Sequence, residues 1–595
     1  MFEICRKTFL ILGPRERRVA IVVTLLMLVQ AVAEVSGIVS IAPFLAVMGN
    51  PEVVRTNARV AWLYNLLGFT DSQTFLEAMG AMAFIVLTGS AFLRGLVQYA
   101  KFRFTNMRRH TLSLRLLEKY IRQPYEYFLQ GNTSQLSKVI LSEVDQFIAN
   151  GLMPLLQIFS YGLVAAGIIA LLLYVSLQLA LLVAGTLGLF YGVVYWRLSA
   201  WIGRLGRDRK IANGVRFQIT AEILGGIKEL KVLGREQVYL DAFKWPSLRF
   251  ARCQTTSQIL SDAPRYLIET VGICTMFLVV LFLLHKNSDL GHALPIIGLY
   301  AFSGYRLLPA AQNIYGALTT LRFSAPAIEA IYNDLAAAGD PQPLQPYQDN
   351  APRMKLKREI GLRKVCFNYP GAPKPALQDI TLSIPALTST GIVGATGAGK
   401  STLVDLILGI LTPFEGAIVI DDVPLSAANL RSWQANIGYV PQQIFLADDT
   451  VARNIAFGVP EARIDRNAVE TAARLAQIHD FILTMPQGYD TLVGERGVRL
   501  SGGQRQRLGI ARALYHDPDV LIFDEATSAL DHETESGVIR AVETLSGQKT
   551  IIMIAHRHDT LRKCGHIIRL DSGRAEVMTQ TAFLAGFRPE GESVR

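Results

Sequence analysis

The sequence predicts a chain of two domains, an all-α membrane domain with six spanning helices followed by a soluble α/β domain. Three observations support this. Half of the 595 residues are hydrophobic and only 18% are charged, a balance typical of a protein that lies partly in lipid. The long apolar stretches lie before residue 320. Beyond a polar, proline-rich segment near residue 340, short β-branched runs alternate with helical ones, which is typical of an α/β domain.

Each of the six apolar stretches can supply the roughly 20 residues that a spanning helix needs. Basic clusters precede the first stretch and follow the second and the fourth. Cytoplasmic loops carry an excess of Lys and Arg, so this pattern places both ends of the chain in the cytoplasm. Membrane topology therefore explains the net charge of +10, and we expect no nucleic-acid partner. The predicted spans are 19–49, 77–104, 149–175, 177–200, 262–285 and 292–320.

The second and fourth spans continue into long polar segments. Residues 105–148 and 201–261 keep a helical periodicity far past the thickness of a bilayer. We expect helices that project into the cytoplasm, with turns near 131–133 and 225–226; two ordinary cytoplasmic loops are the alternative. The expected domains are a membrane domain over 1–335, a linker over 336–353, an α/β domain over 354–580 and a polar tail over 581–595.

A glycine-rich segment at 394–401 matches the pattern G-x-x-x-x-G-K-S and follows a candidate apolar strand. Glycines allow backbone N–H groups to surround phosphate oxygens, and the helix that begins here adds the positive end of its dipole. Lys400 is expected to reach the β- and γ-phosphates of a nucleotide, and the hydroxyl of Ser401 to bind Mg²⁺. The predicted phosphate-binding residues are Gly394, Ala395, Thr396, Gly397, Ala398, Gly399, Lys400, Ser401 and Thr402.

Two carboxylates follow a second apolar strand candidate at 520–523. The end of a buried strand can present Asp524 to the Mg²⁺ shell, while Glu525 polarises the water that attacks the γ-phosphate. On its own, an acidic pair after a strand is usually a helix cap. Together with the loop at 394–401, the pair is the expected second part of an ATP-hydrolysing site.

The sequence Leu-Ser-Gly-Gly-Gln at 500–504 resembles the signature of the ATP-binding-cassette (ABC) family, and the neighbouring family motifs match in order along the C-terminal domain. The resemblance implies an α/β P-loop ATPase domain that uses ATP and Mg²⁺. It implies that Tyr369 stacks on the adenine and that Gln442 senses Mg²⁺ and the attacking water. It also implies that His556 contacts the γ-phosphate and that Asp531 ends a loop which crosses between two cassettes.

The same resemblance implies a homodimer. In this family each ATP lies between the phosphate loop of one cassette and the signature of another, so the signature residues Ser501, Gly502, Gly503 and Gln504 would contact the partner's ATP. Six spans before one cassette resemble a bacterial half-transporter exporter, which lies in the cytoplasmic membrane with its cassette in the cytoplasm. Coupling helices near 130–137 and 223–231 would then carry closure of the cassettes to the membrane half, giving alternating access.

Charged residues inside the predicted spans give a clue to what is transported, because each is costly in lipid and usually faces a cavity or a partner. Besides Glu34 and Glu269, the candidates are Arg94, Arg265 and Arg306, which lie roughly 20–30 Å in from the extracytoplasmic ends of their helices. A ring of guanidinium groups at one depth suits a phosphate or pyrophosphate. Alternatively, Arg265 pairs with Glu269 four residues on, and Arg94 extends to the inner interface.

The membrane half is similar to the lipid-linked oligosaccharide flippases of bacterial protein N-glycosylation, in segments such as 228–231, 263–269 and 305–314. The resemblance implies a polyprenyl-pyrophosphate carrier whose anionic head group enters the arginine cavity. An amphipathic segment at 53–68 could then lie on the outer interface near the polyprenyl tail; an ordinary capping helix is the alternative. Two alternatives stay open: an exporter of drugs or other amphipathic molecules, and a non-transporting regulator or channel on the same architecture. The presence of Glu525 and His556 argues against the last.

Overall fold

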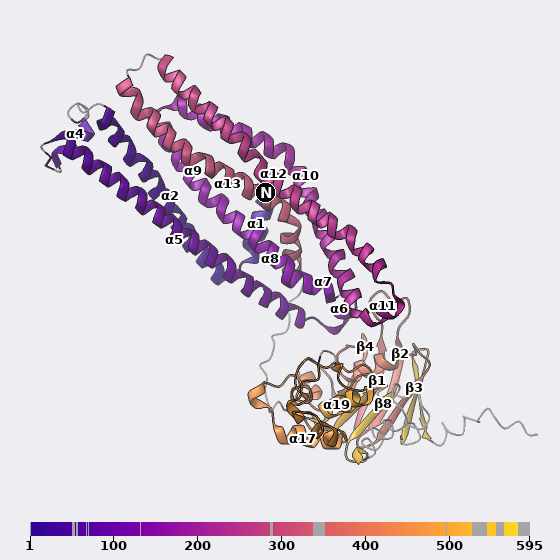
Figure 1. Ribbon diagram of the computed structural model, residues 1–595. Helices are drawn as coiled ribbons and strands as arrows, with labels where there is room; N and C mark the ends of the chain where they lie inside the picture. Colours follow the sequence, from indigo (N-terminus) through magenta and orange to yellow (C-terminus); the bar gives the residue numbers. More distant parts are fainter. Residues whose placement is uncertain are drawn as a thin grey trace, which may run out of the picture. The chain divides into compact units, whose positions relative to one another are not determined.

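The structure is a computed structural model that describes residues 2–49, 54, 58–66, 68–69, 71–130, 133–285, 290–336, 352–494, 497–525, 544–554 and 564–580. The chain divides into two compact units. The first comprises Met1–Gln123 and Gly131–Pro343, and the second comprises Pro124–Gln130 and Leu344–Arg595. The first unit is helical and the second contains two sheets (Figure 1), so the predicted fold class is confirmed.

The first unit is built from long helices. Among the described residues, α2, α5 and the stretch Ser134–Val175 are long and apolar enough to cross a membrane. The other three predicted spans fall within α10, α12 and α13. The elements are α1 (Phe2–Ile11), α2 (Pro14–Gly49), α4 (Ala58–Leu66), α5 (Ser72–Ile121), α7 (Thr133–Lys138), η1 (Val139–Glu143), α8 (Val144–Phe147), η2 (Ile148–Leu152), α9 (Met153–Val175), α10 (Leu177–Gly225), α11 (Ile227–Leu233), α12 (Glu236–His285) and α13 (Leu290–Ala336).

The two helices that were predicted to continue far past a bilayer do so. α5 has 50 residues and α10 has 49, so each is about 75 Å long against a bilayer core of about 30 Å. Asp71 begins α5 because its side chain accepts the backbone N–H of Thr74. α10 ends at Gly225, at the predicted turn. Most of the turn predicted at 131–133 lies outside the described residues.

A close approach between α10 and α13 fixes part of the packing. A Cβ atom on Gly206 would lie 2.1 Å from the carbonyl oxygen of Phe323, so a larger residue would force these helices apart. The guanidinium of Arg209, one turn further along α10, lies 5.7 Å from the centre of the Phe323 ring. Buried Glu143 forms ion pairs with Arg209 at 3.3 Å and with Lys138 at 3.5 Å. This group of three charges is called the Glu143 cluster below.

Part of the outer segment 53–68 forms α4. Val60 is buried and packs with Phe75 and Met79 in a small core, while Trp62 and Leu66 are exposed. The exposed side of the helix therefore includes two large apolar residues. Its place on the outer interface stays a prediction.

The second unit contains two sheets (Figure 1). The larger has the order β10-β9-β3-β8-β7-β6 and is parallel except between β10 and β9. The smaller is antiparallel, with the order β2-β1-β4-β5. The strands are β1 (Glu359–Phe367), β2 (Leu377–Pro385), β3 (Ser389–Gly394), β4 (Glu415–Ile420), β5 (Val423–Pro424), β6 (Ile437–Val440), β7 (Val520–Asp524), β8 (Thr550–Ile554), β9 (His566–Asp571) and β10 (Arg574–Thr579).

Strand β7 is buried on both faces. Val520 and Ile522 pack in the core beneath the smaller sheet, whereas Leu521 and Phe523 pack in a core with helices. A strand covered on both sides is a continuous apolar run, which is why the sequence predicted it. The helices of this unit are α6 (Tyr125–Gln130), α14 (Lys400–Ile407), α15 (Leu430–Gln434), α16 (Val451–Ile455), η3 (Glu461–Arg463), α17 (Arg466–Leu475), α18 (His479–Leu483), η4 (Gly488–Asp490) and α19 (Gly502–Leu514).

Candidate functional site

The predicted phosphate loop joins the end of β3 to the start of α14. Within it, Gly394 and Gly399 have φ angles of 156° and 103°. A Cβ atom on Gly394 would lie 2.3 Å from the carbonyl oxygen of Leu570, and one on Gly399 would lie 2.8 Å from that of Ala376. Both positions therefore require glycine, and the resulting turn can direct backbone N–H groups toward a phosphate.

Lys400 is held by the loop that it follows. It is only 6% exposed, and its Nζ donates hydrogen bonds to the carbonyl oxygens of Gly394 at 2.9 Å and Ala395 at 3.0 Å. The next residue, Ser401, is exposed at the start of α14, where its hydroxyl can reach an ion in solvent.

Tyr369, the predicted adenine-stacking residue, lies in the loop after β1 and reaches the start of α14. Its hydroxyl is 3.0 Å from that of Thr402, and its ring packs edge-on against Phe367 with the centres 5.0 Å apart. The structure thus brings Tyr369 next to the phosphate loop. Its stacking role stays a prediction.

The acidic pair follows β7 as expected. Glu525 has a left-handed backbone, with φ of 47°, and its carboxylate accepts a 2.6 Å hydrogen bond from Nε2 of Gln442. These two residues are 83 positions apart in the sequence. A carboxylate that activates water needs a neighbour to orient it, and the geometry gives Gln442 that position.

A carboxylate that the motifs did not indicate lies near this pair. Burial and the charge of Asp524 raise the pKa of Asp405, on α14, to about 6. Burial and the charge of Glu525 raise the pKa of Asp524 as well. The hydroxyl of Tyr439 donates to Asp524 at 3.4 Å, and its own pKa is raised by burial and by these carboxylates. In the sequence, Asp405 could have been noticed as the acidic residue in the helix that begins at Lys400.

The oxygen atoms around Asp524 fit Mg²⁺. Ser401, Gln442 and Asp524 supply hydroxyl, amide and carboxylate oxygens, which are the ligands that Mg²⁺ prefers. Burial and the charge of Glu525 disfavour the ionised form of Asp524, and the charge of a bound divalent cation would offset both effects. Within the described ranges no group of three His, Cys, Asp or Glu residues forms a metal site of its own.

Helix α6 belongs to the same unit as the ATP site. Burial raises the pKa of the Tyr125 hydroxyl at the start of α6, and the charges of Asp405 and Tyr369 raise it further. Tyr125 therefore lies near the back of the phosphate-binding helix. The coupling segment predicted at 130–137 begins where α6 ends, and its role stays a prediction.

The signature forms the N-terminus of α19. Oγ of Ser501 accepts the backbone N–H of Gln504 at 3.2 Å, and Oε1 of Gln504 accepts the backbone N–H of Ser501 at 2.8 Å. This capping box leaves Ser501 and Gly502 exposed at the start of a 13-residue helix, while Gly503 is buried. Backbone N–H groups at such a helix start suit a phosphate. In a single chain the side chain of Gln504 serves the cap.

Two predicted site residues, His556 and Asp531, lie outside the described residues. The structure therefore gives geometry for the phosphate loop, Tyr369, Gln442, the acidic pair and the signature. The roles of His556 and Asp531 remain those that the family resemblance implies.

The three arginines of the predicted spans have different surroundings. Arg265 pairs with Glu269 on the same helix at 3.2 Å, and both side chains are exposed. Arg306 instead lies 3.9 Å from Glu34, a buried residue on another helix. Arg94 is exposed. The ion pair between Arg265 and Glu269, which was the alternative expected from the sequence, is thus present. The structure also shows a second ion pair, between Glu34 on α2 and Arg306 on α13.

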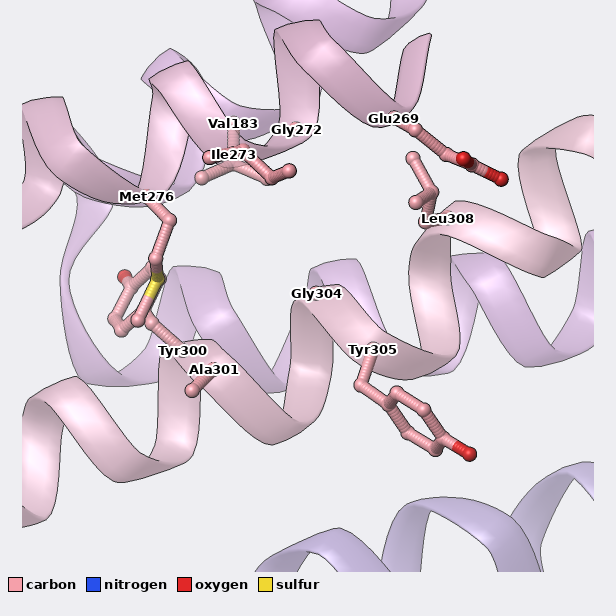
Figure 2. Close-up of a pocket in the computed structure, with 10 residues that line it drawn as sticks. All are labelled: Val183, Glu269, Gly272, Ile273, Met276, Tyr300, Ala301, Gly304, Tyr305 and Leu308. Atoms are coloured by element: carbon pink, nitrogen blue, oxygen red, sulfur yellow. The ribbon is translucent and has the colours of Figure 1, made fainter. Parts of the chain in front are cut away.

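An apolar pocket of about 390 Å³ lies between α10, α12 and α13 (Figure 2). Figure 2 shows Glu269 at one end of the pocket, Met276 and Tyr300 at the other, and Tyr305 directed away. Of the residues that line it, only Glu269 carries a charge. The pocket is suited to an apolar group with a polar or cationic end.

Comparisons with known proteins agree with this geometry. The family model of the ABC transporter transmembrane region matches residues 21–295, and that of the ABC transporter matches residues 377–528. A relative from Burkholderia orbicola (strain AU 1054), named ATP-dependent lipid A-core flippase, is 31% identical over 500 residues, 82% of each chain. One of the same name from Alkalilimnicola ehrlichii (strain ATCC BAA-1101 / DSM 17681 / MLHE-1) is 31% identical over 461 residues, 77% of each chain.

A solved structure shows the same fold over nearly the whole chain. It is described as a bacterial Atm1-family ABC exporter with ATP bound, and it matches with a TM-score of 0.76 and 23% identity. The match covers 97% of this chain and 99% of that one. With its transmembrane region and its ATPase domain, this chain belongs to the ABC transporters, as an ATP-driven exporter.

Proposed function

We propose that two copies of this chain form an exporter that flips an anionic lipid across the bacterial cytoplasmic membrane. The pair between Arg306 and the buried Glu34 carries the proposal, because charges inside spanning helices usually mark the path of a charged group. Relatives named lipid A-core flippases support a lipid as the transported molecule. A lipid-linked oligosaccharide on polyprenyl pyrophosphate, which the sequence resemblance implies, is the second lipid to be tested.

Each cassette would hydrolyse ATP with the residues that the structure gathers. Lys400 would exchange its two carbonyl acceptors for oxygens of the β- and γ-phosphates. Ser401, Asp524 and Gln442 would hold Mg²⁺, which neutralises charge on the transferred phosphoryl group. Glu525, oriented by Gln442, would accept a proton from the attacking water.

The signature of one copy would complete the site of the other. The exposed N-terminus of α19 at Ser501 and Gly502 supports this, because it offers backbone N–H groups to a γ-phosphate. Asp531 and His556 would act at the same interface. Closure of the cassettes, which would lie in the cytoplasm, would then reorient the membrane half through the segments near 130–137 and 223–231.

The test is flipping of a fluorescent lipid in proteoliposomes, read by quenching the label in the outer leaflet. With ATP and Mg²⁺, the wild type should move a labelled lipid A-core or a polyprenyl-diphosphate sugar, and a neutral diacylglycerol lipid should stay in place. Replacing Arg94, Arg265 and Arg306 together by Ala should abolish movement of the anionic lipids. Full movement by this triple variant would contradict an arginine site for the head group.

The apolar pocket favours a second candidate, an exporter of cationic amphipathic molecules. Glu269 at its end could pair with such a cation. In that case a cationic dye would stimulate the ATPase, and Glu269→Gln would remove the stimulation. No stimulation by cationic amphipaths, with flipping of anionic lipids, would exclude this candidate.

A further inference from the structure

A buried polar cluster lies among α2, α5, α9 and α13 of the first unit. At its centre Glu34, on α2, is 7% exposed. It accepts a 2.9 Å hydrogen bond from Nε2 of Gln30 and lies 3.9 Å from a guanidinium nitrogen of Arg306 on α13. Gln30 is 2% exposed, and its Oε1 has no partner among the described residues. These residues, with Lys101 and Tyr161, are called the Glu34 cluster below.

Lys101, on α5, is the second cation of this cluster. It is 3% exposed, and the carboxylate of Glu34 is near enough to attract its ammonium. The ammonium lies 5.6 Å from the centre of the Tyr161 ring on α9. Within the described part of the chain, it makes no hydrogen bond and no close ion pair. A desolvated ammonium held mainly by a ring face is a costly arrangement.

The Glu34 cluster therefore has more positive than negative charge. Lys101 and Arg306 face a single carboxylate. Ionised groups in spanning helices are rare unless they pair or line a path. An anion that entered the cluster would supply the acceptors that Lys101 lacks.

Comparison with the Glu143 cluster shows that this arrangement is loose. There, Lys138 and Arg209 both contact the carboxylate, at 3.5 Å and 3.3 Å. In the Glu34 cluster, Arg306 stays at 3.9 Å and Lys101 contacts an aromatic ring. Cations that are not tightly bound to their own carboxylate are free to exchange it for a ligand.

We propose that Lys101 and Arg306 bind the phosphate of the transported lipid and that Glu34 is the counter-ion which this phosphate displaces. The inference rests on the proposed function and adds to it a lysine and a carboxylate. Ammonium and guanidinium groups both form charge-assisted hydrogen bonds with phosphate oxygens. Glu34 limits the uncompensated charge when no ligand is bound, and it repels the bound phosphate so that the phosphate can leave.

Lys101→Met tests the lysine, because it keeps the length of the side chain and removes the charge. The full chain is reconstituted in phosphatidylcholine vesicles, and its ATPase activity is measured against increasing lipid A or polyprenyl diphosphate. The lipid concentration for half-maximal stimulation should rise about tenfold to hundredfold, the usual effect of losing a hydrogen bond between charged groups. Lys101→Arg should restore it to within a few-fold.

Lys119→Met is the matched control. Lys119 lies on the same helix, but its ammonium donates to the backbone carbonyl of Leu335 at 2.7 Å. The control should not change the half-maximal lipid concentration. Glu34→Gln should lower that concentration and slow the maximal rate of flipping, because the phosphate would then be bound more tightly and released more slowly.

The outcomes separate the site from the function. If both lipids stimulate the wild type and Lys101→Met has the same half-maximal lipid concentration as the wild type for each of them, the site is excluded while the proposed function stands. A shift with only one lipid identifies its phosphate as the ligand. If neither lipid stimulates the ATPase of the wild type and neither is flipped in the proteoliposome assay, the proposed function fails. The site is then tested with inorganic pyrophosphate as the probe. Pyrophosphate should raise the melting temperature of the wild type but not that of Lys101→Met, and an equal rise in both would overturn the proposed site.

Discussion

The ATP site and the Glu34 cluster both gather charges, but of opposite sign. Beside the phosphate loop, Asp524 and Glu525 stand together, and repulsion and burial raise the pKa of Asp524. In the membrane half, Lys101 and Arg306 face the single carboxylate of Glu34. An excess of one charge that makes no close ion pair within the chain is costly to bury unless something outside the chain balances it. The sign of the excess thus indicates the ligand, a metal ion with its nucleotide in one region and an anionic head group in the other.

The largest expected effect breaks the ATP site. Glu525→Gln keeps the hydrogen-bonding shape but removes the base, so ATP turnover should fall about 10²- to 10⁴-fold. Binding of ATP should be retained, since Lys400 and the loop are unchanged. Phosphate release at saturating ATP and binding of a fluorescent ATP analogue measure the two properties. Normal turnover by this variant would mean that another group is the base.

The Glu143 cluster is the next test, because both of its cations contact its carboxylate directly, at 3.5 Å and 3.3 Å. Glu143→Ala would leave Lys138 and Arg209 buried without their carboxylate, and we expect a loss of about 3–5 kcal/mol in the free energy of unfolding. Thermal unfolding in detergent measures it. Glu3→Ala is the control, because Glu3 is 69% exposed and pairs with Lys7 at the surface, where a pair contributes at most about 1 kcal/mol. Equal melting of both variants would contradict a structural role for the cluster.

A smaller effect concerns pH and the acidic excess at the ATP site. The pKa of Asp405 is about 6 in the folded chain, against an ordinary value of 3.8. Above pH 6 the buried charge therefore destabilises the fold; between pH 6 and pH 4 the folded state binds a proton first and gains stability. Asp405→Asn should stabilise the chain at pH 7 by about 1–2 kcal/mol, allowing for solvent screening.

The measurement is the melting temperature from pH 7 to pH 4.5, with a chelator and without nucleotide. The difference between wild type and Asp405→Asn should shrink as the pH falls. A difference that stays constant would show that Asp405 is ionised at low pH and that the carboxylates repel one another less than the structure indicates.

The smallest effect belongs to Arg265 and Glu269. They form an exposed pair four residues apart on one helix, and such pairs contribute about 0.3–0.5 kcal/mol. Glu269→Gln should therefore leave the melting temperature nearly unchanged. A large decrease in the melting temperature would mean that this pair is buried in the functional assembly, as the Glu34 cluster is buried in the single chain.

The ATP site was predictable because short-range rules fix it. The clashes that a Cβ atom would make at Gly394 and Gly399 explain the glycine pattern in the sequence. The meeting of Gln442 with Glu525 follows from the parallel pairing of β6 and β7, in which Val440 lies opposite Phe523. Residues just past the ends of two adjacent parallel strands lie at the same edge of the sheet.

The Glu34 cluster was only partly predictable. Arg306 and Glu34 stood out as charges in apolar spans, but their pairing depends on how α2 packs against α13, and their apolar surfaces do not specify that. Lys101 was missed because it lies near the end of the predicted span 77–104, where a lysine usually extends to the interface. Arg265 could be paired from sequence alone, since its partner is four residues away.

The π-helical turns η1 and η2 determine how the helix that follows them, α9, is oriented about its own axis. Lys138 and Glu143 are five residues apart, a spacing that places side chains about 140° apart in an α-helix but on one face across a π-turn. Each π-turn absorbs one extra residue and so rotates the following helix by about 100°. The two inserted residues therefore set the rotation of α9 about its own axis, and deleting either one would turn Tyr161 away from Lys101.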